Sequence, residues 1–267
     1  MHLPGLGGGL GYTAAMVVVT FNFKTRRNFA LGLSNAGVGA GLFALAPLMQ
    51  LARSFYGNTG FFIILAAMTA NIIPLGMVCF PSNLEKYAKY KRESQNIQGI
   101  GTHKFTDTLK MYYNSILTKG IIMLSVSLML YSVGTYSIYF LLPSFTPFIG
   151  FTPIQASFFL AMSGIAGIPG RTLTGVISNI RQVGVLIPYV SSMAVIAVAT
   201  FIYPFVASHY PGQVIYLTIF GMLVGSCYVV TGPLSEKFVP IQFVSSAIGL
   251  QFMAGGVGAV LGPVFSG

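Results

Sequence analysis

The feature that most constrains this chain is a series of eight apolar segments, each about 20 residues or longer. A stretch of this length crosses the ~30 Å hydrocarbon core of a bilayer as an α-helix. Charged residues are 7% of the chain, against about 25% in soluble domains. The runs are too long for the alternating strands of a membrane β-barrel. We therefore predict an all-α membrane protein. The predicted spans are 4–22, 29–52, 59–80, 120–143, 155–179, 183–207, 212–232 and 243–267.

Basic residues are concentrated in alternate links between these spans. Twelve of the fourteen Lys and Arg residues lie at 23–28, 81–119, 180–182 and 233–242. The positive-inside rule places these four links in the cytoplasm. The net charge of +10 therefore reflects topology, and we predict a lipid bilayer rather than nucleic acid as the partner of this chain.

Arg171 is the one basic residue inside an apolar span. It precedes Arg181, at the cytoplasmic end of the span, by ten residues, or roughly 15 Å of helix, which predicts a position near the membrane midplane. A cation there costs at least ~2.5–3.5 kcal/mol. The four acidic residues all lie in links, so the leading candidate to offset this cost is an anionic substrate. Ser163, Gly167 and Thr174 share its helix face.

A second group of polar residues lies within the span 120–143. Tyr131, Ser132, Thr135 and Tyr136 are in its deeper part. Ser132 and Tyr136 are four residues apart and therefore share a helix face. An interfacial aromatic belt is the alternative explanation, and it suits the outer end of the span. We predict that Ser132 and Tyr136 line a substrate cavity together with Arg171.

The long polar link 81–119 divides the chain into 1–80, with three spans, and 120–267, with five. An internal repeat supports a division into related halves, because Ala30-Leu-Gly-Leu recurs as Ala247-Ile-Gly-Leu six spans later. Six-helix halves related by a parallel repeat are the plan of major facilitator transporters. The chain then corresponds to helices four to eleven. We expect a fragment of a twelve-helix protein that does not transport when expressed as given.

Small residues recur at a spacing of four in two spans. Gly37 with Gly41, and Ala254 with Gly258, have the small-x-x-x-small pattern that permits close helix approach. The sequence predicts tight helix packing at both places.

Three motifs resemble the monocarboxylate transporter family. Residues 21–27 (Phe-Asn-Phe-Lys-Thr-Arg-Arg), followed by Gly32, Gly37, Gly39 and Gly41, resemble its fourth-to-fifth helix motif. Residues 245–250 (Ser-Ser-Ala-Ile-Gly-Leu) with Leu261-Gly-Pro resemble its eleventh helix, and Gly170-Arg171 with Gly175 resembles its eighth. The order and spacing of the motifs agree over the whole chain.

The resemblance implies a major facilitator fold and transport of small organic anions by alternating access. Arg171 matches the arginine thought to meet the substrate carboxylate in that family. An aspartate linked to proton coupling in many animal members corresponds to Gly167, and an arginine near the eleventh-helix motif corresponds to Phe243. Proton symport through this aspartate and arginine is therefore not expected. Protons remain a possible partner through other residues.

Two other interpretations remain open. The chain could belong to a non-transporting, degenerate membrane protein, or to a facilitator with another solute such as an aromatic amino acid. Hydrolase, phosphate-loop and metal motifs are not evident in the sequence, so we predict no enzyme and no cofactor. We expect a multi-pass protein of the plasma membrane.

Overall fold

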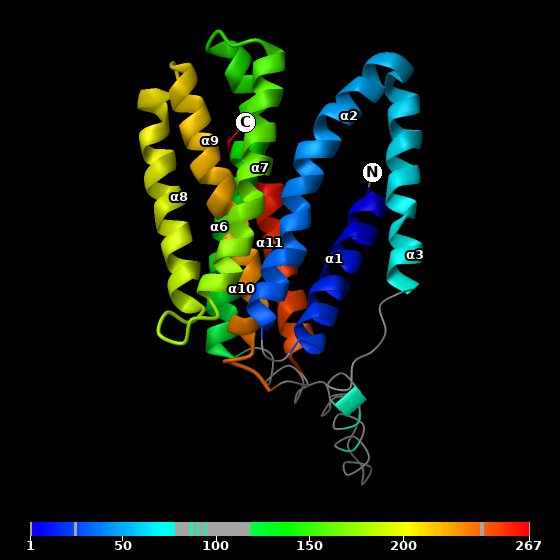
Figure 1. Ribbon diagram of the computed structural model, residues 1–267, viewed down its shortest axis with the longest axis vertical. Coiled ribbons are helices and arrows are strands. Elements are labelled where there is room, and N and C mark those ends of the chain that lie inside the picture. The colour runs from blue at the N-terminus through cyan, green and yellow to red at the C-terminus, as the bar shows by residue number, and fades with distance from the viewer. Residues whose placement is uncertain are drawn as a thin grey trace. The chain divides into compact units, whose positions relative to one another are not determined.

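A computed structural model describes residues 2–23, 26–77, 86–87, 90, 94, 118–240 and 243–266. These residues form helices, with no strand among them. The predicted link 81–119 lies outside the described residues apart from 86–87, 90, 94 and 118–119. The helices, labelled in Figure 1, are α1 (His2–Asn22), α2 (Arg27–Ala70), α3 (Ile72–Met77), α6 (Lys119–Phe148), α7 (Pro153–Ile177), α8 (Leu186–Val206), α9 (Tyr210–Val224), α10 (Ser226–Ser235) and α11 (Val244–Ser266).

In the described part of the chain, each predicted span coincides with helical residues. Six stretches of the described chain are long and apolar enough to cross a membrane: Arg27–Leu45, Ser54–Met77, Lys119–Phe148, Leu186–Val206, Tyr210–Ser235 and Val244–Phe265. The other two predicted spans are α1 and α7, which have 21 and 25 residues and are rich in glycine. The prediction of an all-α membrane protein is confirmed.

Two glycines divide helical stretches into separate parts. Gly57 has φ +65° and lies at a kink inside α2, and this left-handed conformation is readily accessible only to glycine. The kink lies near the start of the apolar stretch Ser54–Met77, which follows Arg27–Leu45 along the same helix. Gly225 caps the end of α9 before α10 begins. The predicted span 212–232 is therefore two helices rather than one.

The chain packs as two compact units. The first contains Met1–Arg27, Pro81–Ser137 and Thr231–Gly267, and the second contains Asn28–Phe80 and Ile138–Val230. These units differ from the predicted division into 1–80, 81–119 and 120–267. That division concerns the halves of a transporter and stays a prediction.

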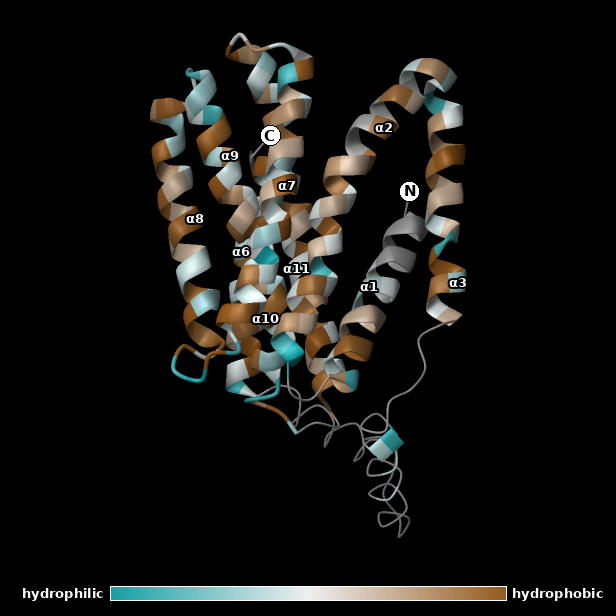
Figure 2. Ribbon diagram, viewed as in Figure 1, coloured by the Kyte–Doolittle hydropathy of each residue, from teal (hydrophilic) through white to brown (hydrophobic). Residues whose placement is uncertain are grey.

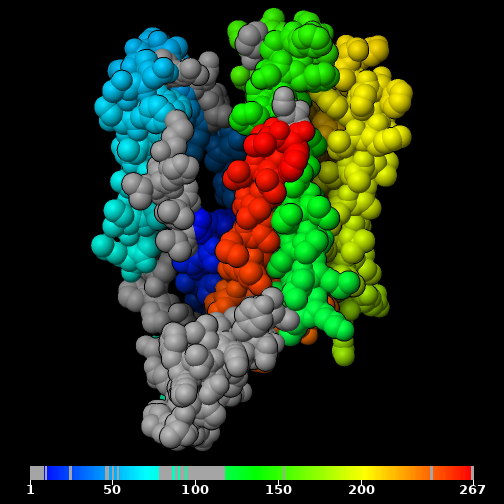
Figure 3. All heavy atoms as spheres, turned by 180° about the vertical axis from the view of Figure 1, so that it is seen from behind, coloured from blue at the N-terminus to red at the C-terminus, as the bar shows by residue number. Residues whose placement is uncertain are grey.

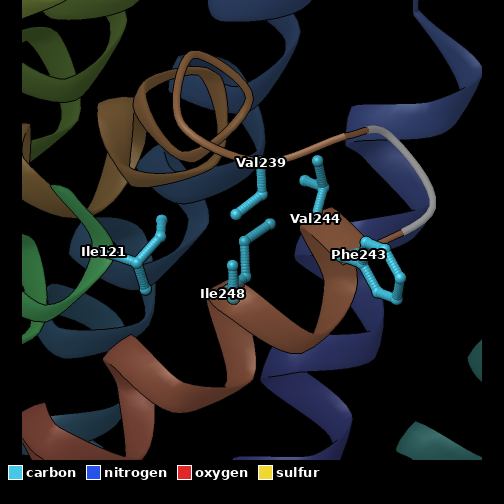
Figure 4. Close-up of a cluster of buried hydrophobic side chains, with 6 residues drawn as sticks. Ile121, Val239, Phe243, Val244 and Ile248 are labelled. Carbon is cyan, nitrogen blue, oxygen red and sulfur yellow. The ribbon is translucent and has the colours of Figure 1, made fainter. Parts of the chain in front are cut away.

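The first unit has a small apolar core where α11 begins. Ile121 of α6 and Val239 point toward Ile248 of α11 (Figure 4). Phe243, Val244 and Ala247 complete the buried cluster, with Val17 of α1 packed against it. The rings of Tyr12 and Phe252 lie 5.2 Å apart, one from α1 and one from α11. Aliphatic and aromatic contacts therefore join three helices at this end of the unit.

Close packing of α11 against the N-terminal part of α6 depends on glycine. The two helices lie side by side in Figure 3, where α11 is red and α6 is green. A Cβ atom on Gly258 would overlap the carbonyl of Met129, and one on Gly262 would lie 2.5 Å from the carbonyl oxygen of Val133. Tight packing at Gly258 is therefore confirmed. The prediction is wrong for Gly37 and Gly41, because no described atom lies within 4 Å of a Cβ at either position.

In the second unit, polar and aromatic side chains join α8 to α9. The hydroxyl of Tyr203 donates to Gln213 Oε1 at 2.9 Å, and Gln213 Nε2 donates to the Ala207 carbonyl at 2.7 Å. Gln213 is fully buried, so these hydrogen bonds offset the cost of burying its amide. The rings of Tyr203 and Tyr216 stack with centroids 4.2 Å apart. The α8–α9 pair is therefore fixed by specific contacts near their connection.

The surface of α8 matches a lipid environment. Hydrophobic residues predominate along this helix (Figure 2). Phe201 and Phe205 each expose 78% of their surface. Exposed aromatic side chains of this kind are an aggregation liability in water but are favourable in the hydrocarbon core. The chain is therefore a multi-pass integral membrane protein.

Candidate functional site

The helix that carries Arg171 has well-defined ends. Thr152 and Gln155 form a capping box, in which Thr152 N donates to Gln155 Oε1 at 2.8 Å and Gln155 N donates to Thr152 Oγ1 at 3.3 Å. Pro153 follows at the start of the helix, where its missing N–H costs nothing. At the other end, Asn28 Nδ2 of α2 donates to the Ser178 carbonyl at 2.9 Å. These bonds hold α7 at both termini.

Pro169 lies two residues before Arg171, and α7 continues through it without a break. Proline cannot donate the hydrogen bond that an α-helix normally makes to the residue four positions earlier. The carbonyl of Ile165 therefore lacks its usual helical donor. The helix is intact but locally less constrained, in the turn that precedes the arginine.

Glycine lets α2 approach one side of α7. A Cβ atom on Gly32 would lie 3.1 Å from the Cα of Gly175, and one on Gly39 would lie 2.7 Å from the carbonyl oxygen of Gly164. Both distances are shorter than the 3.4 Å of ordinary contact. The two backbones therefore meet directly at two places, seven residues apart along α2 and eleven apart along α7.

A second set of glycines lets α9 approach another side of α7. A Cβ atom on Gly170 would overlap the backbone of Met222, and one on Gly221 would overlap the backbone of Ser163. The backbone of α7 therefore meets a neighbouring helix at close range on two sides.

The side chain of Arg171 occupies space that three glycines leave open. A Cβ atom on Gly225 would overlap the Nε end of Arg171, and one on Gly167 would overlap Nη1. A Cβ atom on Gly39 of α2 would lie 3.0 Å from the same Nη1. We call Gly39, Gly167 and Gly225 the guanidinium seat. Arg171 is 8% exposed, so the seat holds a permanent positive charge away from solvent.

Hydroxyl groups extend this buried polar region one turn further along α7. Thr174 Oγ1 and Ser226 Oγ lie 2.7 Å apart, and Thr174 Oγ1 also donates to the Gly170 carbonyl at 2.9 Å. Ser226 therefore donates to Thr174, because the single hydroxyl hydrogen of Thr174 is already used. Ser163, Gly167 and Thr174, predicted to share the face of Arg171, are all buried on α7.

The other two predicted site residues, Ser132 and Tyr136, belong to the unit that does not contain Arg171. Ser132 is fully buried, and its Oγ would lie 3.3 Å from a Cβ atom on Gly255 of α11. Tyr136, one turn later, is 44% exposed. Substrate contact by Ser132 and Tyr136 stays a prediction.

Glu236 is the acidic residue of the described part of the chain, and it pairs with Arg27. Arg27 also donates through Nε to the Phe23 carbonyl at 2.9 Å. Burial raises the pKa of the Glu236 carboxyl, against the lowering effect of Arg27. The sequence placed both residues in cytoplasmic links but did not predict that they pair, because nothing in the local pattern relates positions 209 residues apart.

Comparison with known proteins identifies the family. The family model of the Major Facilitator Superfamily matches residues 3–263. The chain belongs to this superfamily. It is 26% identical to monocarboxylate transporter 4 of Gallus gallus, over 99% of the chain and 55% of that protein. It is 24% identical to monocarboxylate transporter 12 of Rattus norvegicus and 25% identical to monocarboxylate transporter 13 of Bos taurus, each over 99% of the chain and 58% of the relative.

These relatives confirm the resemblance to the monocarboxylate transporter family within the superfamily. The chain spans about half the length of the relatives that it matches.

Proposed function

We propose that the protein is a secondary transporter that carries small organic anions of the monocarboxylate type by alternating access. The observation that carries this proposal is the buried guanidinium of Arg171, held in the seat of Gly39, Gly167 and Gly225. The names of its relatives, monocarboxylate transporters 4, 12 and 13, agree with this substrate class. Its expected location is the plasma membrane.

The chemistry of arginine suits a carboxylate substrate. The guanidinium is planar and presents N–H donors in a fork that matches the two carboxylate oxygens. It stays charged at every physiological pH. In a site with little water the attraction between the two charges is much stronger than in bulk solvent. The seat restricts where the guanidinium can lie, so less conformational entropy is lost when the anion binds.

The proposal assigns no proton carrier to the seat. Position 167, one turn before Arg171 on the same face, is glycine and cannot titrate. Anion uptake should therefore not require protonation of a residue at this position. Coupling to a proton elsewhere in the protein is not part of the proposal.

The test is uptake of radiolabelled monocarboxylates by the complete protein in liposomes. An ammonium group keeps the charge of Arg171 but cannot form the bidentate pair, so Arg171→Lys loses one charge-assisted hydrogen bond. Such a bond contributes about 1.5–3 kcal/mol, which corresponds to roughly a 10- to 150-fold rise in KM. Arg181→Lys, in the exposed turn after α7, is the matched control and should transport normally.

Wild-type kinetics in Arg171→Lys would contradict the assigned role of this residue. Saturable uptake of an aromatic amino acid but of no monocarboxylate would favour a facilitator with another solute. Correctly folded protein that transports none of these compounds would favour a non-transporting membrane protein.

A further inference from the structure

The first part of α6 has a continuous exposed face. This face consists of one lysine followed by hydrophobic side chains: Lys119, Ile122, Met123, Val126 and Leu130. The hydrophobic residues follow Lys119 at three, four, seven and eleven positions, so all five form one row along the helix. In a membrane such an apolar row lies against acyl chains. Lys119 therefore lies where the acyl chains of an adjacent lipid meet its headgroup.

An aromatic contact brings a second cation close to Lys119. The ring of Phe238 packs against Gly120 of α6, where a Cβ atom would overlap it. Lys119 comes directly before Gly120, at the start of the helix. Lys237 comes directly before Phe238, in the turn that follows α10. The two lysines thus flank one contact, and their long, flexible stems let both ammonium groups approach the same anion.

In the part of the chain that the structure describes, neither lysine is neutralised by a carboxylate. Glu236 is the acidic residue there, and it pairs with Arg27. Lys119 and Lys237 are both exposed. Lys119 also lies in the first turn of α6, where the positive end of the helix dipole disfavours a cation. An anion from outside the protein would offset this unfavourable electrostatic energy.

We propose that Lys119 and Lys237 bind the headgroup of an anionic phospholipid, whose acyl chains lie along the exposed row of α6. Both lysines belong to links that the positive-inside rule places in the cytoplasm. The cytoplasmic leaflet carries anionic lipids, which juxtamembrane lysines attract. A free phosphate would match the charges but would leave the apolar row uncovered. The inference goes beyond the proposed transport function and does not depend on it.

A general attraction between the protein and the membrane surface makes a different prediction. Every Lys or Arg near that surface attracts anionic lipids by a similar amount. Removing any one cytoplasmic cation would then weaken lipid binding equally, whereas a defined site depends on the two lysines beside Phe238. Arg181 is the matched control. It is exposed and lies in another predicted cytoplasmic link, and it belongs to the unit that contains neither lysine.

The experiment measures binding of phosphatidylserine to the complete protein in detergent by native mass spectrometry. Phosphatidylcholine has the same phosphate and acyl chains but no net charge, so it should bind more weakly. One cation at the surface contributes about a 5-fold change in affinity. Lys119→Gln and Lys237→Gln should therefore each raise the Kd of the first phosphatidylserine by that factor. Lys119→Arg, which keeps the charge, and Arg181→Gln should bind it like the wild type.

Thermal unfolding gives a second measurement, because a ligand that binds the folded state raises Tm. Phosphatidylserine should raise the Tm of the wild type more than that of the double variant Lys119→Gln/Lys237→Gln. Similar Tm values without added lipid would show that the variant is folded.

An affinity loss confined to the two lysine variants supports the proposal. Four results would overturn it: an equal loss in Arg181→Gln, no loss in the lysine variants, equal binding of phosphatidylcholine by the wild type, or equal Tm shifts in the wild type and the double variant. Displacement of the lipid by glycerophosphoserine, its soluble headgroup, would also overturn it, because the acyl chains would then have no part in binding.

Discussion

The contact between Gly39 and α7 is a sensitive place to test the packing around Arg171. In Gly39→Ala the new methyl group would lie 2.7 Å from the carbonyl oxygen of Gly164. Ordinary contact begins at 3.4 Å, so the two backbones must separate by about 0.7 Å. Both atoms at this contact belong to helix backbone, and no flexible side chain can absorb the movement.

The size of the effect follows from two opposing contributions. Overpacking a close contact costs roughly 1–3 kcal/mol, while alanine is favoured over glycine in a helix by about 1 kcal/mol. Gly41→Ala is the matched control, since a Cβ atom there meets no described atom within 4 Å and the variant receives only the favourable contribution. The two variants should therefore differ by roughly 1–3 kcal/mol, or roughly 2–12 °C in Tm for a chain of this size.

Thermal unfolding in detergent can be followed with a thiol-reactive dye, because the thiol of Cys227 is fully buried in the folded protein. The same variants would be assayed for lactate uptake. Displacement of Gly39 from the guanidinium should raise the KM in Gly39→Ala and leave it unchanged in Gly41→Ala. Equal Tm values for the two variants would refute the close approach of α2 and α7 on which the seat depends.

Two further predictions concern charge. Gly167→Asp would place a carboxylate beside Arg171 that competes with the anionic substrate, so uptake should fall at least ~10-fold at neutral pH and recover on acidification. Gly167→Asn, the control, should show no such recovery. If uptake by both variants is equally independent of pH, the prediction is contradicted. The pKa of the Glu236 carboxyl is raised, because the effect of burial is larger than the opposing effect of Arg27. The wild-type protein should therefore lose stability relative to Glu236→Gln as the pH rises through that raised pKa. The difference in Tm between the two proteins, measured from about pH 4 to pH 8, checks the sign, and a difference that changes in the opposite direction would contradict it.

The membrane spans could be predicted from the sequence because transfer of a helix into lipid depends mainly on the composition of one continuous segment. Within the residues that the structure describes, all eight expected spans coincide with helices. The boundaries between helices were harder to predict from the sequence. The end of α9 at Gly225, for example, is not marked by any change in hydropathy. A glycine inside an apolar run looks the same whether it ends a helix or lies in one.

The site was predictable only in part. Arg171 was evident because it is a charged residue that interrupts an apolar segment, which the sequence alone shows. The sequence did not show which of Gly37, Gly39 and Gly41 makes a close helix contact. Because these glycines are two residues apart, Gly39 lies on a different helix face from the other two. The small-x-x-x-small rule selected Gly37 and Gly41, and the structure instead places Gly39 in the close contact.

The sequence by itself determined that this chain spans the membrane as helices, that it carries a cation inside one of them, and that its motifs match one transporter family. Only the tertiary structure decided which glycines surround Arg171 and that Glu236 pairs with Arg27. The physical reason is the range of the interactions. Burial in lipid depends on adjacent residues, whereas close backbone approach and ion pairing depend on the rotation and register of helices that are distant in sequence.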